Sequence, residues 1–154
     1  PLDCWLAQRG LGTLPLRLNQ ASANAMGVAR FLQEQESCVE QVQYPGLACH
    51  ADHALAKRQF GDRFGTMVTF NLAGGEAAAN QFIQAANGFP FCPSLGELST
   101  TLSHPVSTSH RNLGDRDRQQ LGITPGTIRL SVGIESMEFI LERMTTSLSA
   151  LGTG

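Results

Sequence analysis

The sequence contains no run of about 18 apolar residues, the length that a membrane-spanning helix requires. It also shows no secretory signal, because no basic region followed by an apolar stretch opens the chain. The formal net charge is -2, so the chain lacks the excess of basic residues that is typical of nucleic-acid-binding proteins. We therefore expect neither a membrane nor a nucleic acid as a partner.

Lysine is almost absent, since Lys57 is the only one in the chain. A lysine amine is the group that forms a Schiff base with carbonyl compounds. Any Schiff-base chemistry within this chain would have to use Lys57, which lies in an ordinary amphipathic stretch.

The chain has four cysteines, and no two of them form a CxxC pair: Cys4, Cys38, Cys49 and Cys92. A disulfide framework is not expected in a chain of this size and apolar content. We expect the cysteines to be reduced and mostly buried, as in a cytoplasmic protein. Cys49, His50 and His53 resemble metal ligands at the start of a helix, but no fourth ligand follows at a suitable spacing. We therefore predict no metal site.

Length and composition favour one globular domain. Of the 154 residues, 42% are hydrophobic and 16% are charged, which is ordinary for a chain with a sizeable core. We expect the domain to cover residues 1–151 and residues 152–154 to form a tail. The first residue is Pro1 rather than methionine, so we expect that an upstream portion is missing.

Hydrophobic periodicity predicts several helices. The longest opens at Pro15, since proline is tolerated in the first turn of a helix. Its apolar residues recur at steps of three and four, which gives one continuous stripe: Leu14, Leu18, Ala21, Ala25, Val28 and Leu32. Other helices are predicted at residues 2–9, 52–60, 76–86 and 116–121, and a last one follows its N-cap, Ser136.

Strands are predicted at residues 39–44, 68–72, 89–95, 100–104 and 128–134. Strands and helices alternate without the regular rhythm of a doubly wound parallel sheet. We therefore predict an α+β fold with a mainly antiparallel sheet and helices on one face.

Arg129 is the strongest candidate for binding a ligand. On the predicted strand its neighbours Ile128 and Leu130 point into the core, so Arg129 points to the opposite face. That face otherwise carries only small residues: Thr127, Ser131 and Gly133. A guanidinium with this freedom can form a bidentate pair with a carboxylate. The alternative is an arginine that simply faces solvent.

Short motifs run along the whole chain in a characteristic order. The first half carries Asp3, Trp5-Leu6, Arg9-Gly10-Leu11 and Tyr44-Pro45-Gly46-Leu47. The second half carries Ser94-Leu95-Gly96-Glu97, His104-Pro105, Ser109-His110 and Ile128-Arg129-Leu130-Ser131-Val132-Gly133-Ile134-Glu135. Together they resemble the C-terminal domain of the pyridoxal-phosphate enzymes of cysteine and methionine metabolism. That family includes cystathionine γ-synthase, cystathionine γ- and β-lyases, methionine γ-lyase and O-acetylhomoserine sulfhydrylase.

The resemblance implies the small C-terminal domain of a fold-type-I enzyme. Pyridoxal phosphate would be bound by a lysine on a larger N-terminal domain, so this chain alone would be inactive. The complete enzyme would be a homotetramer that catalyses γ- or β-elimination or replacement on a sulfur amino acid or an O-acylhomoserine. The apolar stripe from Leu14 to Leu32 would pack on the missing domain, so we expect it to be partly exposed here or paired with another copy. The alternative is a non-catalytic binding or interaction domain derived from such an enzyme.

The resemblance also assigns roles to four residues. Arg129 would hold the substrate α-carboxylate, Ser94 and Leu95 would help to hold the substrate beside the cofactor lysine, and Ser109 would support Arg129. Without the resemblance, Ser94 would be a serine in a local turn and Ser109 a serine of no special role. Members that act on cystathionine carry a glutamate where this chain has Ser99. This departure favours a smaller or less polar thiol or thioether substrate.

Overall fold

The computed structural model of the chain describes residues 1–152, and residues 153 and 154 of the predicted tail lie outside the described residues. Four strands form one antiparallel sheet in the order β1-β2-β4-β3. The strands are β1 (Val39–Gln43), β2 (Met67–Leu72), β3 (Thr101–Ser103) and β4 (Thr127–Ser131). The helices are α1 (Leu2–Gln33), α2 (His53–Phe60), α3 (Gly75–Ala85), α4 (Asp115–Gln120) and α5 (Met137–Ser149).

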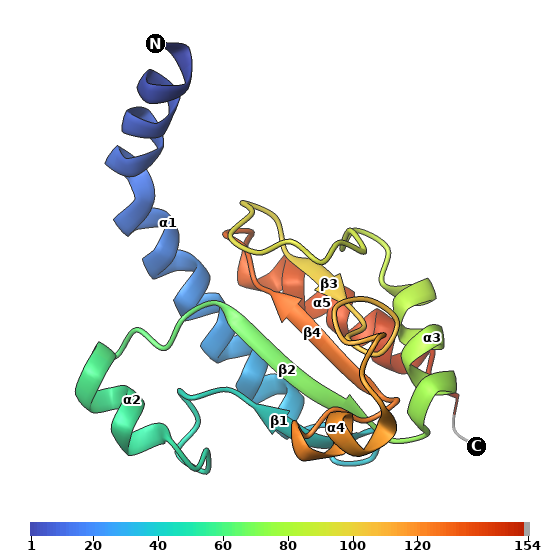
Figure 1. Cartoon of the computed structure of the whole chain (residues 1–154). Helices are drawn as coiled ribbons and strands as arrows, with labels where there is room; N and C mark the ends of the chain where they lie inside the picture. The colour runs from blue at the N-terminus through green and yellow to red at the C-terminus, as the bar shows by residue number, and fades with distance from the viewer. Residues whose placement is uncertain (153–154) are drawn as a thin grey trace.

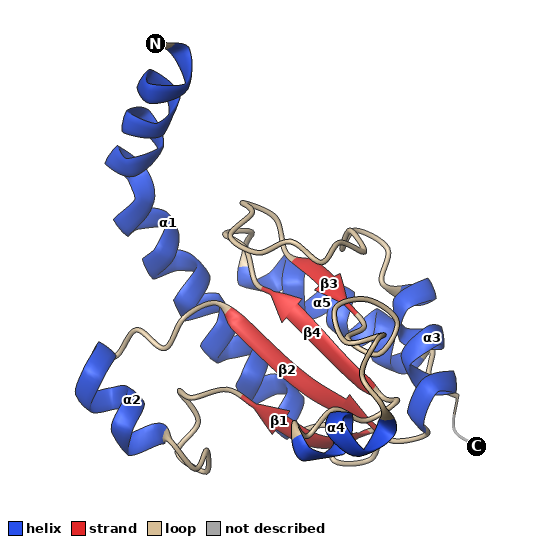
Figure 2. Cartoon of the chain, in the orientation of Figure 1, coloured by secondary structure: helices blue, strands red, loops and turns tan. Residues whose placement is uncertain are grey.

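Three of the helices cover one face of the sheet. In Figure 1, α1 and α5 lie behind the strands, α3 lies at the right of the sheet and packs on α5, β2 and β4, α4 lies in front, and α2 stands apart beyond the β1 edge. Figure 2 shows the same layers, with the helices in blue and the strands in red. The predicted α+β fold, with antiparallel strands and helices on one face, is confirmed.

The core forms because the strands alternate apolar and polar side chains, which project to opposite faces. Val68 of β2 pairs with Leu130 of β4, which pairs in turn with Leu102 of β3, and none of the three is more than 1% exposed. Phe70 and Ile128 form the next apolar pair and are fully buried. Burial of each such side chain contributes about 1.5–3 kcal/mol. The residues between these positions therefore point away from the three packed helices.

Helix α1 is one continuous helix of 32 residues, so the predicted break between residues 2–9 and Pro15 is wrong. Pro15 lacks the N–H that would bond to the Leu11 carbonyl oxygen, and α1 continues without that one bond. Two side chains bond to the neighbouring carbonyl oxygen of Gly10. Arg17 Nη2 donates to the carbonyl oxygen of Gly10 at 2.7 Å, and Thr13 Oγ1 donates to the same oxygen at 3.4 Å. Gly10 does not adopt a positive φ, the conformation that commonly ends a helix at glycine.

The apolar stripe of α1 is partly exposed, as predicted. Ala25, Val28 and Leu32 are fully buried, whereas Leu14 and Leu18 are 42% and 40% exposed. The first half of α1 extends beyond the sheet in Figure 1 and carries further exposed apolar side chains: Leu2, Trp5, Leu6, Leu11 and Leu16. An apolar surface of this kind is typical of an interface.

The strand predicted at residues 89–95 does not form. Phe91 makes one isolated parallel bridge to Leu102. Pro90 and Pro93 have no N–H to donate to a neighbouring strand, which explains why the pairing does not extend.

The C-terminal helix follows the prediction closely. Ser136 is the N-cap of α5, and its Oγ accepts the backbone N–H of Phe139 at 3.2 Å. Ile140, Met144 and Leu148 are buried on one face of the helix, as their spacing predicts.

All four cysteines are free thiols, but the expectation that most of them are buried is wrong. Cys4 is exposed on the projecting half of α1, and Cys49 is exposed in the turns before α2, while Cys38 and Cys92 are half-buried. Within residues 1–152, none of the helices combines the length and apolarity needed to cross a membrane.

Candidate functional site

Arg129 lies at the centre of the sheet face that the three packed helices leave free. It is paired directly with Thr69 of β2 and with Ser103 of β3, and Thr69 is paired with Gln43 of β1. These four side chains therefore form one row across all four strands. The Arg129 side chain is half-buried, and among the described residues its guanidinium makes no hydrogen bond or ion pair.

The strand positions around Arg129 on this face carry no charge: Gln41, Gln43, Met67, Thr69, Asn71, Thr101, Ser103, Thr127 and Ser131. The polar neighbours on β4 are already engaged, since Thr127 Oγ1 donates to Asn71 Oδ1 at 2.6 Å and Ser131 Oγ accepts from Gly96 N at 3.3 Å. A planar cation without a counter-ion matches a carboxylate, which can accept two parallel N–H bonds from it.

The Ser94-Leu95-Gly96 turn lies beside this row, next to Ser131 of β4. The hydrogen bond from Gly96 N to Ser131 Oγ fixes the turn two positions along β4 from Arg129. Gly96 has a φ of +79°, a conformation that favours glycine. Leu95 is 68% exposed and Ser94 is half-buried. The Ser94 hydroxyl makes no hydrogen bond within residues 1–152, so the geometry gives no support to a role as a local turn cap.

Ser109 lies in the turns that follow β3 and is exposed. Its Oγ lies 2.8 Å from Nδ1 of His110, and the described structure contains no hydrogen bond between Ser109 and Arg129. His104 is 2% exposed and places Nε2 2.9 Å from the Pro125 carbonyl oxygen, so its ring is buried and has a backbone partner.

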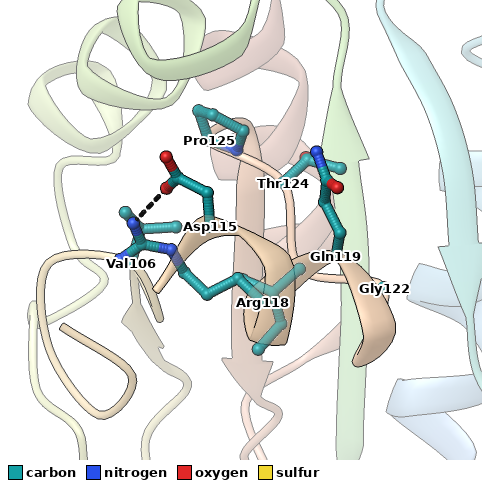
Figure 3. A pocket seen from close by; sticks show the side chains of 8 residues that line it. Val106, Asp115, Arg118, Gln119, Gly122, Thr124 and Pro125 are labelled. Carbon is teal, nitrogen blue, oxygen red and sulfur yellow. Dashed lines mark hydrogen bonds and ion pairs between the residues drawn. The ribbon is translucent and has the colours of Figure 1, made fainter. Parts of the chain in front are cut away.

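A hollow of about 420 Å³ lies beside α4, at the Thr127 end of β4 (Figure 3). Among the described residues that line it, Arg118 is the one cation, and its guanidinium is paired with the carboxylate of Asp115. Because this charge is already neutralised, the hollow offers a weaker carboxylate site than Arg129 does.

Asn24, Thr100 and Glu135 were missed by the sequence analysis, yet they form a buried polar network at the end of β4. Asn24 is 1% exposed and Thr100 is fully buried. The one available signal was Asn24, a polar residue between the apolar positions of a helix predicted to pack on a core, because a buried amide needs hydrogen-bond partners.

The histidines and cysteines near α2 have other partners. His53 places Nδ1 2.8 Å from the Pro45 carbonyl oxygen and stacks on Phe64, while Cys49 Sγ accepts from Gln33. In the part of the chain that the structure describes, no group of three or more His, Cys, Asp or Glu side chains is arranged to hold a metal ion.

Comparison with known proteins identifies the family. Residues 1–149 match the model of the family described as Cys/Met metabolism PLP-dependent enzyme. The chain belongs to this family. The O-succinylhomoserine sulfhydrylase of Pseudomonas aeruginosa is 39% identical over 98% of the chain, which spans 37% of that protein.

Solved structures of the family share the fold. The cystathionine gamma synthase of Xanthomonas oryzae pv. oryzae, in complex with cystathionine, matches with a TM-score of 0.89 and 41% identity over 98% of the chain and 38% of the solved chain. The cystathionine gamma-lyase from yeast matches with a TM-score of 0.93 and 34% identity over 98% of the chain and 39% of the solved chain. The chain thus spans well under half the length of these relatives.

The family implies pyridoxal phosphate in the complete enzyme, but the residues of this chain do not fit its covalent attachment. Lys57 lies on α2, which stands beyond the β1 edge, away from β4 (Figure 1). Its side chain is 62% exposed, and its Nζ lies 3.8 Å from a carboxylate oxygen of Asp62. A Schiff-base lysine belongs in a desolvated site beside the substrate, and Lys57 is not in such a place.

Proposed function

We propose that this chain is the C-terminal, substrate-orienting domain of a pyridoxal-phosphate enzyme that acts on sulfur amino acids or O-acylhomoserines. The reaction would be elimination or replacement at the γ or β carbon. The chain spans 37–39% of the relatives described above, and it has no lysine in a suitable environment. In this proposal, a separate N-terminal domain supplies the lysine and the rest of the cofactor site.

The observation that carries the proposal is the free guanidinium of Arg129. An amino-acid substrate always brings an α-carboxylate, and Arg129 is a half-buried cation on a sheet face whose strand positions offer no carboxylate of their own. Binding there would hold the substrate by the end that does not react. The reacting carbon of the substrate would then lie at a fixed distance from Arg129, and such fixed orientation accelerates a reaction.

The Ser94 turn would supply the second contact. The Ser94 hydroxyl has no partner within the described residues and lies in the turn that Gly96 fixes to β4. We assign Ser94 and the Leu95 backbone to the substrate and Ser109 to a supporting role. The four free cysteines favour a reducing, cytoplasmic setting, and the complete enzyme would be a homotetramer.

Ser99 favours a substrate without a distal amino group. It is exposed at the edge of the Ser94 turn, at the position where the resemblance places a glutamate in members that act on cystathionine. We therefore rank an O-acylhomoserine with a small thiol above cystathionine.

The test is a substrate panel on the complete enzyme loaded with pyridoxal phosphate. The panel would contain O-succinyl-L-homoserine with sulfide, O-acetyl-L-homoserine with sulfide, L-methionine and L-cystathionine. We expect turnover of at least one of the first three, with a higher kcat/KM than for cystathionine. Lack of turnover by a cofactor-loaded enzyme would reject the proposal and favour a binding domain without catalysis.

A further inference from the structure

The segment that carries Ser94 is held by very little apolar packing. Residues 95–99 are all exposed, and the two leucines among them, Leu95 and Leu98, are 68% and 55% exposed. The segment also lacks a regular helix or strand. Since apolar burial does not anchor it, its position relative to Arg129 must depend on hydrogen bonds.

Those hydrogen bonds converge on Thr100, where the exposed segment enters the sheet. Thr100 Oγ1 donates to Glu135 Oε2 at 3.0 Å and accepts the Gly133 N–H at 3.0 Å. The Thr100 backbone N–H donates to the other carboxylate oxygen, Glu135 Oε1. One carboxylate thus binds both the hydroxyl and the backbone of a fully buried residue, and hydrogen bonds to a charged group are among the stronger ones.

The residues just after β4 are in backbone contact with the same segment. Ile134 N donates to the Leu98 carbonyl oxygen at 2.9 Å. A Cβ at Gly133 would collide with that same carbonyl oxygen and lie 2.6 Å from the Ser99 carbonyl carbon. Only glycine fits here, so the two chain segments are in backbone contact.

Helix α1 fixes the other side of this arrangement. Asn24 Nδ2 donates to the carbonyl oxygens of Gly133 at 3.0 Å and of Glu135 at 2.9 Å. Glu135 is therefore held through its backbone by α1, and its carboxylate holds Thr100. Rigid elements on both sides suit a site that must keep a fixed geometry.

We propose that Thr100 and Glu135 are positioning residues that set the Ser94 turn at its place beside Arg129. This inference rests on the proposed function, because the position of the Ser94 turn matters only if that turn binds the substrate. Neither residue touches the substrate. They act through residues 94–99. Within residues 1–152, the other hydrogen bonds that join this segment to β4 and the residues after it are those of Gly96 with Ser131 and of Leu98 with Ile134.

The adjacent threonine provides a matched control. Thr101 is 3% exposed, next to Thr100 in sequence, and its hydroxyl has no hydrogen-bond partner in residues 1–152. Thr100→Val and Thr101→Val make the same chemical change at neighbouring buried sites, but only the first removes bonds to Glu135 and Gly133.

The first measurement is hydrogen–deuterium exchange in the complete enzyme. Thr100→Val removes both bonds of the Thr100 hydroxyl, and it should increase exchange about tenfold at the amides of Gly96 and Ile134, whose N–H groups bond Ser131 and Leu98 and so hold the segment. A tenfold change corresponds to about 1.4 kcal/mol. Glu135→Gln should act in the same direction. Thr101→Val should leave exchange at these two amides unchanged, and Thr100→Ser, which keeps the hydroxyl, should keep it as slow as in the wild type. Equal exchange in all four variants would overturn the inference.

The second measurement is the division between KM and kcat with the substrate that turns over in the panel above. A displaced Ser94 turn should raise KM about tenfold for Thr100→Val and change kcat less than about twofold, since it weakens binding of ground and transition states alike. Partial unfolding would instead lower kcat at constant KM. If Arg129→Lys raises KM and Thr100→Val does not, the inference fails and the proposed function stands. If neither variant raises KM, the proposed function itself fails.

Discussion

Replacing Arg129 by alanine is the most direct test of the candidate site. In the complete enzyme the substitution should lower kcat/KM for the amino-acid substrate and leave the absorbance of bound pyridoxal phosphate unchanged. The reason is that the Arg129 guanidinium has no hydrogen-bond or ion-pair partner among the described residues, so its removal should affect a ligand rather than the fold.

The size of the effect follows from the environment of the guanidinium. Truncating one member of a desolvated charge pair costs about 2–5 kcal/mol. Arg129 is half-buried rather than fully buried, so we take the lower half of that range, because solvent screens a partly exposed charge. About 2.7 kcal/mol corresponds to about a 10²-fold fall in kcat/KM. Arg129→Lys keeps the charge but loses the planar fork, so it should still impair the enzyme.

Steady-state kinetics on the purified complete enzyme would measure this change. Arg116→Ala is a suitable control, because Arg116 is exposed on α4 and makes no hydrogen bond or ion pair within residues 1–152. Near-normal kcat/KM for Arg129→Ala would place the carboxylate elsewhere. A variant that lost cofactor instead of substrate affinity would refute the reasoning as well.

Three further predictions concern the cofactor and the stability of the fold. Lys57→Arg should leave the cofactor absorbance and kcat unchanged, because Lys57 is exposed and remote from β4; loss of the absorbance band would show that Lys57 carries the Schiff base after all. Ser136→Ala should lower the free energy of unfolding by about 1 kcal/mol in urea titrations, since Ser136 caps α5 by accepting from Phe139, and an unchanged midpoint would contradict this. Burial raises the pKa of Tyr44, and a hydrogen bond with Ser22 lowers it in part. The stability that the neutral Tyr44 phenol contributes is present below its ordinary pKa of about 10 and is lost as pH rises through the folded-state pKa. Above about pH 10, the free energy of unfolding of the wild type should therefore fall more steeply than that of Tyr44→Phe. Parallel pH curves for the two proteins would argue against this prediction.

The parts of the fold that could be predicted from the sequence are those set by local periodicity. Residues 127–134 alternate apolar and polar side chains, and β4 follows that pattern, with Arg129 on the face away from the packed helices. The Ser136 cap and the buried face of α5 were equally local signals. In each case, the pattern within a few residues decides both the element and the direction of its side chains.

Other features depend on contacts that no local pattern contains. Gly10 and Pro15 predict a helix break, but Gly10 does not adopt a positive φ and α1 continues through both residues. Likewise, the bond between Thr100 and Glu135 joins residues 35 positions apart. The partners of such buried polar groups are set by how the elements pack, and packing is not visible in a window of sequence.

The two faces of β4 explain why Arg129 can remain without a partner. Ile128 and Leu130 are fully buried against the core, so they hold the strand in place without any contribution from Arg129. An unpaired, half-buried cation does not help folding, because desolvation of a charge is unfavourable unless a counter-ion compensates for it. The residue is therefore better explained by a ligand that completes the pair than by the stability of the domain. The carboxylate of such a ligand would compensate for the loss of hydration that burial imposes on the Arg129 guanidinium, which lies between Thr69 and Ser103 in the sheet.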